Sequence, residues 1–257
     1  MRRDKQKLIL VTNDDGLEAK GLASLIRAVE KLGKVVIAAP LEPQSGMSQA
    51  ITVKHPLRVK KSQINGCDSY AINGTPTDCV KLAFNQLLPR KPDLLVSGIN
   101  HGSNSSTSVL YSGTLGAALE GCVNKIPSIG FSLISYDPDA DFEAAIHYAH
   151  KIVARILAEG LPQYTCLNVN IPVSPLHEIK GIKICRQTIG FWQEEFDKRT
   201  DPGGREYYWL TGEYFNTEPH AEDTDEWALR NNYVAIVPMR IDLTCYNTLE
   251  KLKKWKF

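Results

Sequence analysis

Alternation between short apolar runs and amphipathic segments is the feature that most constrains the fold of this 257-residue chain. Residues 8–11 (LILV) are continuously apolar, as in a strand that is buried on both faces. Apolar residues then recur at helical spacing from Leu22 to Leu32, and Gly33 is placed to end that helix. A second apolar run at 35–39 follows, so this region predicts a strand, a helix and a strand.

The same alternation continues to about residue 171. Further strands are expected at 94–96, 129–134 and 167–171. Helices are expected over 141–159, after Ser112, and after Thr75, where Pro76 and Asp78 suit a helix N-terminus. Strands that alternate with helices indicate an α/β fold, with a mostly parallel sheet covered by helices on both faces.

From about residue 172 the pattern changes. Short alternating segments at 182–185, 205–209 and 233–237 are typical of hairpin strands, and the chain ends in a Lys-rich helix. The acidic stretch 218–226 is most simply interpreted as a solvated surface turn rather than a cation site. We therefore divide the chain into a core, residues 1–171, and a C-terminal hairpin and helix region, residues 172–257.

Composition excludes several classes of partner. The 30 Lys and Arg residues against 29 Asp and Glu leave a net charge of +1, which argues against binding of nucleic-acid polymers or a membrane surface. We find no apolar stretch long enough to span a membrane, and residues 1–7 do not resemble a signal peptide. The six cysteines are scattered without a Cys-x-x-Cys pair, so we expect reduced thiols and a cytoplasmic location.

Polar side chains follow three of the expected strands, at the end of a parallel sheet where ligands bind. They are Asn13, Asp14 and Asp15 after the first strand, Ser45, Gly46 and Ser48 after the second, and Asn100 and Asn104 after the third. Adjacent carboxylates repel each other, and a cation beside them relieves the repulsion. Carboxylate, hydroxyl and amide oxygens suit Mg²⁺ or Mn²⁺. The alternative is that Asp14 caps the next helix and Asp15 is solvated, but the three polar sets together favour a metal site.

A second candidate feature is an anion cradle at the start of an apolar helix. The hydroxyls and backbone N–H groups of Ser112, Gly113 and Thr114 could hold a phosphate, although plain N-capping is the simpler interpretation of this triplet alone. Combined with a divalent ion, the cradle suggests a phosphate ester attacked by activated water. We place His101 in the pocket wall. Five aromatic residues could stack on a base or, more simply, pack in a subunit interface, namely Phe191, Trp192, Tyr207, Tyr208 and Trp209.

At these residues the chain resembles the SurE survival-protein nucleotidases. The matching segments are LVTNDDG at 10–16, APLEPQSG at 39–46, NGTPTDCV at 73–80, VSGINHGSN at 96–104 and VLYSGTLGAALEG at 109–121. The resemblance implies a metal-dependent 5′-nucleotidase that hydrolyses nucleoside 5′- and 3′-monophosphates. It also implies a Rossmann-like three-layer core, and a C-terminal β-hairpin and helix that exchange between subunits of a homodimer or homotetramer.

The resemblance also implies roles for individual residues. The ligands of one Mg²⁺ or Mn²⁺ ion would be Asp14, Asp15, Ser45 and Asn100, and the catalytic residues would be Asp14, Asp15 and Asn100. The phosphate-binding residues would be Asn13, Ser45, Gly46, Asn104, Ser112, Gly113 and Thr114. The chain departs from the family at Ser105 to Ser108, where a Leu-Gly pair followed by an acidic or small residue is common. A serine in place of that glycine changes the backbone freedom of the loop.

Other functions are compatible with parts of the pattern. A signalling receiver also has an acidic pair after its first strand, but it needs an acceptor aspartate after the third, where this chain has Asn100. A nucleotide-binding sensor without catalysis would use the same metal and phosphate groups. A broad acid phosphatase or exopolyphosphatase would use them as well.

Overall fold

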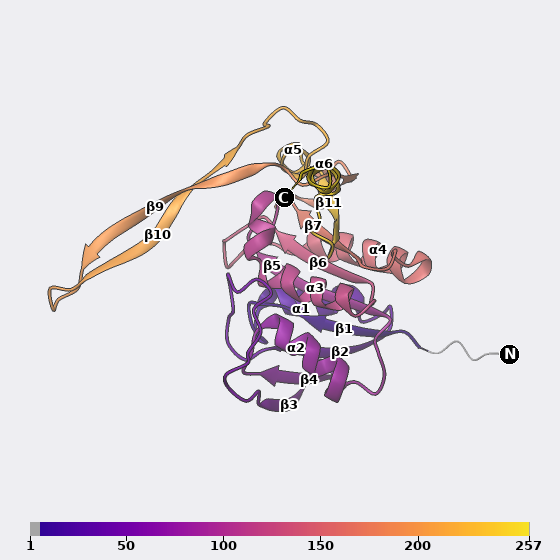
Figure 1. Ribbon diagram of the computed structural model, residues 1–257. Coiled ribbons are helices and arrows are strands. Elements are labelled where there is room, and N and C mark those ends of the chain that lie inside the picture. Colours follow the sequence, from indigo (N-terminus) through magenta and orange to yellow (C-terminus); the bar gives the residue numbers. More distant parts are fainter. Residues whose placement is uncertain (1–5, 257) are drawn as a thin grey trace.

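The computed structural model describes residues 6–256 and has at its centre a nine-stranded sheet with helices on both faces (Figure 1). Residues 1–5, which form most of the segment examined above for a signal peptide, and residue 257 lie outside the described residues. None of the helices in the described part is long and apolar enough to cross a membrane. All six cysteines are free thiols, and five of them are buried or partly buried.

Six parallel strands form the middle of the sheet. The strands of the whole sheet are β1 (Leu8–Thr12), β2 (Lys34–Pro40), β3 (Val59–Ile64), β4 (Cys67–Ile72), β5 (Leu94–His101), β6 (Ser128–Leu133), β7 (Thr165–Ile171), β8 (Ile182–Ile184) and β11 (Val234–Arg240). Their order is β3-β4-β2-β1-β5-β6-β7-β11-β8. Counted along the chain, the parallel strands from β4 to β7 run 3-2-1-4-5-6, which is the Rossmann order. The expected Rossmann-like α/β core is therefore confirmed.

The helices form the two outer layers. They are α1 (Lys20–Val29), α2 (Pro76–Leu82), α3 (Gly113–Val123), α4 (Glu143–Glu159), α5 (Asp225–Arg230) and α6 (Tyr246–Leu252). Helices α1 and α4 pack against each other in one layer, and α2 packs against α3 in the other. In α1, the apolar side chains predicted from helical spacing, such as Leu22 and Leu25, are buried against Ile9 and Val35 of the sheet.

The predicted N-terminus of α2 is a reciprocal cap. The Thr75 hydroxyl accepts from the Asp78 backbone N–H at 3.1 Å, and an Asp78 carboxylate oxygen accepts from the Thr75 N–H at 3.0 Å. The same carboxylate accepts from the Thr52 N–H at 3.0 Å, and the Thr75 hydroxyl donates to the Ala50 carbonyl at 2.6 Å. The cap therefore also fastens the loop that follows β2 to the protein body.

Replacing Asp78 by alanine should lower the free energy of unfolding by about 2 kcal/mol, because the N–H groups of buried Thr75 and partly buried Thr52 lose their acceptor. Denaturant unfolding monitored by circular dichroism measures this change. Asp68→Ala is the control, since its carboxylate lies 4.0 Å from exposed Lys61 and should contribute little. An equal loss in both variants would contradict the role of the cap.

Two of the three segments interpreted as hairpin strands belong to the central sheet instead. Strand β8 pairs in parallel with β11, and β11 pairs antiparallel with β7. Residues 234–237 are all buried, so this short apolar segment covers the edge of β7 rather than forming a hairpin. Only residues 205–209 fall in a hairpin, which is formed by β9 (Gly190–Thr200) and β10 (Glu206–Asn216).

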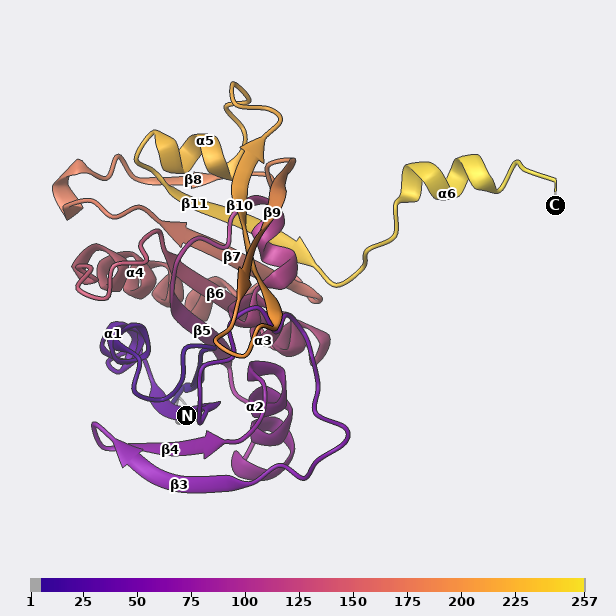
Figure 2. The ribbon, with the colours of Figure 1, turned by 90° about the vertical axis from the view of Figure 1, so that its left-hand side faces the viewer.

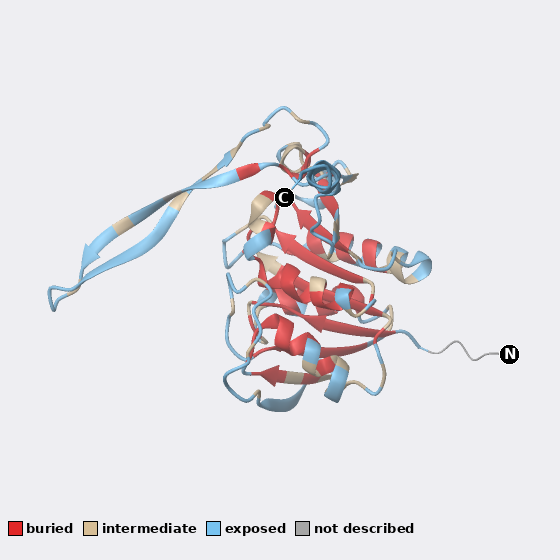
Figure 3. Ribbon diagram, viewed as in Figure 1, coloured by how far each residue is buried: buried red, intermediate tan, exposed pale blue. Residues whose placement is uncertain are grey.

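The hairpin and α6 both project from the core. The hairpin extends far to one side in Figure 1, and Figure 2 shows α6 at the end of an extended segment. Both are mostly exposed, in contrast to the buried sheet (Figure 3). Large apolar side chains are exposed along them, namely Phe191, Trp192, Phe196, Tyr208, Trp209, Leu210, Phe215, Leu243, Tyr246, Leu249, Leu252 and Trp255.

Candidate functional site

The predicted site residues gather where the strand order reverses. Strands β1 and β5 are neighbours, with Thr12 opposite Ser97, and the connections that follow them lead to opposite faces of the sheet. Ligands of open α/β sheets bind at this point, outside the carboxyl ends of the strands. A cavity of about 570 Å³ lies here. The predicted site residues that line it are Asp14, Ser45, Gly46, Asn100, Asn104 and Ser112.

The buried carboxylate of Asp14 lies between the loop after β2 and the N-terminus of α3. The Thr114 hydroxyl donates to Asp14 Oδ1, and the Gln44 N–H donates to the Asp14 carbonyl at 2.7 Å. Gly113 lies so close that a Cβ there would be 2.8 Å from Asp14 Cβ. Thr114 and Gly113 therefore do not line the cavity but support a residue that does.

Burial raises the pKa of Asp14 to about 6, against the hydrogen bond from Thr114, and the neighbouring Asp15 raises it further. Burial likewise raises the pKa of the half-buried Asp15, whose Oδ2 accepts from the His101 N–H at 3.4 Å. The alternative that Asp14 caps the next helix is wrong, because the N-cap of α1 is Ala19. The adjacent carboxylates of Asp14 and Asp15 are thus held where water reaches them poorly.

Asn100 also lines the cavity, whereas Asn13 and Asp15 do not. Asn100 donates from Nδ2 to the Gly102 carbonyl at 2.9 Å, which leaves its Oδ1 available as an acceptor. Asn13 donates to the Gly16 carbonyl at 2.8 Å, and its buried Oδ1 has no partner among the described residues. His101 lines the cavity wall as expected, with its ring 5.0 Å from that of Phe142.

These donors fit a hard divalent cation. They are carboxylate, amide and hydroxyl oxygens, and the two carboxylates are destabilised in the absence of positive charge. Within residues 6–256 no group of three or more His, Cys, Asp or Glu side chains could hold a metal, so a zinc-type ligand set is not found there. The site depends instead on Asn100 and on Ser45, which is exposed on the loop after β2.

The opposite side of the cavity is suited to an anion. Ser112 caps α3 by accepting from the Leu115 N–H at 3.1 Å, so the capping interpretation is correct, but the same residue lines the cavity. A helix N-terminus directs backbone N–H groups and positive potential toward an anion. Asn104 is buried beside it, with its Nδ2 donating to Ser132 Oγ at 2.8 Å and its N–H to Asn170 Oδ1 at 2.9 Å.

The cavity also contains residues that the sequence interpretation missed. They are Ser103, Ser108, Tyr136, Leu210, Thr211 and Gly212. Tyr136 could have been found, because it follows β6 at the same edge of the sheet as Asp14 and Asn100. The three residues of β10 could not, since only the fold brings the hairpin over the cavity together with Trp192 of β9.

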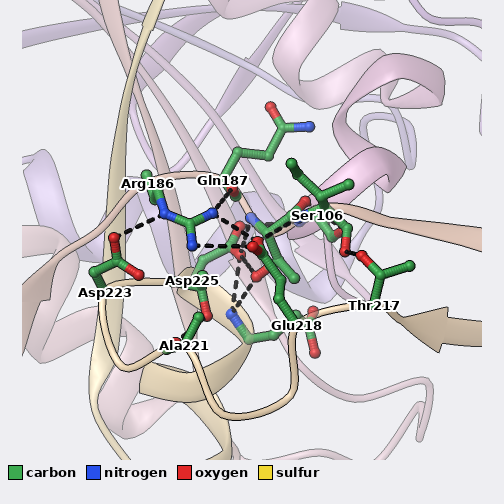
Figure 4. Close-up of polar contacts among 12 residues, drawn as sticks. Ser106, Arg186, Gln187, Thr217, Glu218, Ala221, Asp223 and Asp225 are labelled. Atoms are coloured by element: carbon green, nitrogen blue, oxygen red, sulfur yellow. Dashed lines mark hydrogen bonds and ion pairs between the residues drawn. The ribbon is translucent and has the colours of Figure 1, made fainter.

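The interpretation of residues 218–226 as a solvated turn is wrong for Thr224 and Asp225, which are both fully buried. Glu218 and Asp223 pair with Arg186 at 2.6 and 2.8 Å, in partly exposed positions (Figure 4). Asp225 is fully buried and accepts from the Ser106 N–H at 2.9 Å. It joins the acidic stretch to the loop that carries Asn104.

Comparisons with known proteins give one consistent result. The family model described as "Survival protein SurE" matches residues 9–194. The protein named "5'-nucleotidase SurE" of Flavobacterium psychrophilum is 51% identical over 250 residues, covering 96% of this chain and 97% of its own. Its counterpart in Bacteroides fragilis, with the same name, is 50% identical and covers 98% and 99%. The crystal structure of SurE from Aquifex aeolicus superposes with a TM-score of 0.82 at 40% identity, covering 96% and 98%.

Proposed function

Because the chain belongs to the SurE survival-protein family, we propose that it is a 5′-nucleotidase, a phosphomonoesterase that hydrolyses nucleoside 5′- and 3′-monophosphates to nucleoside and phosphate. One observation carries the proposal beyond family membership. Asp14 contacts both Thr114 and Gly113 at the N-terminus of α3. The proposed metal ligands and the proposed anion cradle therefore meet at Asp14. A phosphate ester in the cavity would contact both sets.

We assign one divalent ion, Mg²⁺ or Mn²⁺, to Asp14, Asp15, Ser45 and Asn100. When bound, the ion supplies positive charge at the phosphate and makes water a stronger nucleophile at neutral pH. Ion binding would also relieve the repulsion between the two carboxylates, whose pKa values burial raises. Asp14, Asp15 and Asn100 are the residues to which we assign a direct part in catalysis.

The other proposed residues hold the phosphate. Ser112 and Asn104, which line the cavity, provide the direct contacts, and Gly113 and Thr114 contribute from behind by holding Asp14 at the N-terminus of α3. Such fixed donors stabilise the charge that develops on the phosphoryl oxygens in the transition state. Asn13, Ser45 and Gly46 complete the phosphate-binding set.

The remaining wall of the cavity suits a nucleoside. Tyr111, Tyr136, Trp192 and Leu210 give it apolar and aromatic surface, on which a base can stack. Its volume of about 570 Å³ lies within the range of small-molecule sites. An inorganic polyphosphate would gain little from this surface, so we favour nucleotides over polyphosphate as substrates.

We also propose a homodimer or homotetramer in which hairpin β9–β10 and helix α6, both in the C-terminal region of residues 172–257, exchange between subunits whose cores are residues 1–171. The support is the exposed apolar surface of the hairpin and α6, including Phe196, Trp209 and Leu249. A monomer in water rarely leaves so much apolar surface uncovered on extended segments. We also propose a cytoplasmic location, which the scattered cysteines without a Cys-x-x-Cys pair support. The net charge of +1 is compatible with an enzyme that acts on small phosphate esters.

Treatment with EDTA should reduce phosphate release from AMP at least about 100-fold, and added Mn²⁺ or Mg²⁺ should restore it. A colorimetric phosphate assay measures both, with 3′-AMP and polyphosphate as parallel substrates. Unchanged hydrolysis after chelation would contradict the metal assignment. Tight binding of AMP without phosphate release, whichever divalent metal is added, would instead identify a nucleotide-binding sensor.

A further inference from the structure

Asp225, at the first position of α5, is a fully buried carboxylate outside the catalytic set described above. Four donors converge on it, one of them from Ser106, which Figure 4 shows beside it. Ser106 N–H reaches Oδ2 at 2.9 Å, while Oδ1 accepts from the Thr188 N–H at 2.9 Å, the Thr188 hydroxyl at 2.5 Å and the Glu226 N–H at 2.9 Å. A carboxylate accepts at both oxygens, so it satisfies all four, whereas an amide would turn its own N–H₂ toward one set of donors.

Ser106 needs this support because of its backbone conformation. Its φ is +51°, in the left-handed region that costs free energy for residues other than glycine. Its hydroxyl donates to the Thr188 carbonyl at 2.9 Å and accepts from the Tyr214 hydroxyl at 2.5 Å. Together with the bond to Asp225, these contacts hold a strained residue in one conformation.

The strained residue lies two positions from Asn104 in the cavity loop. Between them, Ser105 donates to Glu226 Oε1, next to Asp225. On the other side, Asn104 is fixed to β6 and β7 by Ser132 and Asn170. The loop is therefore clamped from two directions, by the sheet and by the N-terminus of α5.

The same network reaches the hairpin. Thr188 lies two residues before the start of β9, and Tyr214 belongs to β10. Gly190 makes the Tyr214 contact possible, because a Cβ at residue 190 would lie 2.1 Å from the tyrosine hydroxyl. The hairpin that is anchored here carries Trp192 and Leu210 into the cavity wall.

We propose that Asp225 is a positioning residue for phosphate binding, which locks Ser106, and through it Asn104, to the root of hairpin β9–β10. The phosphate-binding loop and the hairpin wall of the cavity then behave as one unit. This inference rests on the proposed nucleotidase function. The role proposed for Asp225 concerns only the phosphate side of the site. The proposed metal ligands Asp14 and Asn100 make no contact with Asp225 or its partners among the described interactions.

Asp225→Asn in the full chain tests the proposal. We expect the KM for AMP and the Ki for inorganic phosphate to rise about tenfold, because a buried charged hydrogen bond to the loop is lost. The Mn²⁺ concentration for half-maximal activity should stay unchanged. Asp223→Asn is the matched control, since this neighbouring carboxylate contacts Arg186 and not Ser106, and it should leave all three constants unchanged.

A folded Asp225→Asn variant with unchanged KM and Ki would overturn the proposal, as would an equal shift in its Mn²⁺ requirement. If that variant does not fold, Tyr214→Phe decides, because it removes one hydroxyl from a partly exposed side chain. We then expect about a threefold rise in the phosphate Ki, and no rise would overturn the proposal.

Hydrolysis of AMP by the wild type tests the proposed function separately. If the wild type binds inorganic phosphate but does not hydrolyse AMP, the proposed nucleotidase function is contradicted. The phosphate affinities of the variants, measured by calorimetry, then still test the role of Asp225. A wild type that neither binds phosphate nor hydrolyses AMP overturns both.

Discussion

Replacing Asp14 by asparagine is expected to abolish hydrolysis and, at the same time, to stabilise the metal-free protein. The loss of activity should be at least about 1,000-fold in kcat/KM, because one of the two carboxylates proposed to hold the ion is lost beside the proposed phosphate cradle. Stability should rise because the removed charge is buried next to Asp15. The asparagine oxygen can still accept from Thr114, so the local packing is retained.

The pKa of Asp14 gives the size and the pH dependence of the stability gain. Its pKa is raised from 3.8 to about 6 in the folded protein, so ionisation costs stability as pH rises between these values. The full cost, about 1 to 3 kcal/mol, is present above pH 6 and absent below pH 3.8. Denaturant unfolding in EDTA at pH 7.5 and at pH 4 should therefore show a gain for Asp14→Asn only at the higher pH.

Asp15→Asn is the matched comparison for this experiment. It should also fold and lose turnover, but with a smaller gain in stability, because Asp15 is only half-buried. Near-normal phosphatase activity in either variant would refute the metal assignment. A loss of stability in Asp14→Asn at pH 7.5 would show that the carboxylate is favourable in the folded protein, against the argument from burial.

Gly113→Ala should reduce kcat/KM about 100-fold while leaving a folded protein. The added methyl group would lie 2.8 Å from Asp14 Cβ and 3.0 Å from its Oδ2, so the carboxylate must move. Displacement of a catalytic group by about 1 Å can cost about two orders of magnitude in rate. Steady-state kinetics with AMP and Mn²⁺ measures the loss, and thermal unfolding verifies the fold.

Gly121→Ala provides the control on the same helix. A Cβ at residue 121 would lie 2.2 Å from Ser128 Oγ, in the layer behind the site. It should lower the melting temperature without changing kcat or KM of the folded fraction. If both alanine variants retain wild-type kinetics, close contact between Gly113 and Asp14 is not required for catalysis.

Much of the core fold could be predicted because each element carries its own pattern. Buried parallel strands such as β1 are continuously apolar, α1 has one apolar face, and the cap of α2 is formed by residues three positions apart. The candidate site could be predicted from the sequence for the same reason. Asp14 and Asp15 come just after β1 and Asn100 is the penultimate residue of β5, so the alternation of strands and helices was enough to place them at one edge of the sheet.

The C-terminal region was harder because its local pattern does not specify a partner. An alternating segment such as residues 233–237 has the same sequence character whether it pairs in a hairpin or covers β7. In the sheet, Ala235 pairs with Asn170, which lies about 65 residues earlier in the chain. A local sequence pattern contains no information about a partner at that distance.

The sequence by itself determined the parallel α/β core, from short-range periodicity and capping, and it placed the carboxylate pair and the small residues at the start of α3 at the ends of those elements. The Rossmann-like order of the strands was expected only from the resemblance to the SurE family. The tertiary structure alone decided that the hairpin closes over the cavity and that Asp225 is buried among four donors rather than solvated. The physical reason is that burial depends on which distant segments pack together. A carboxylate in an acidic stretch looks hydrated until the fold places Ser106 and Thr188 against it.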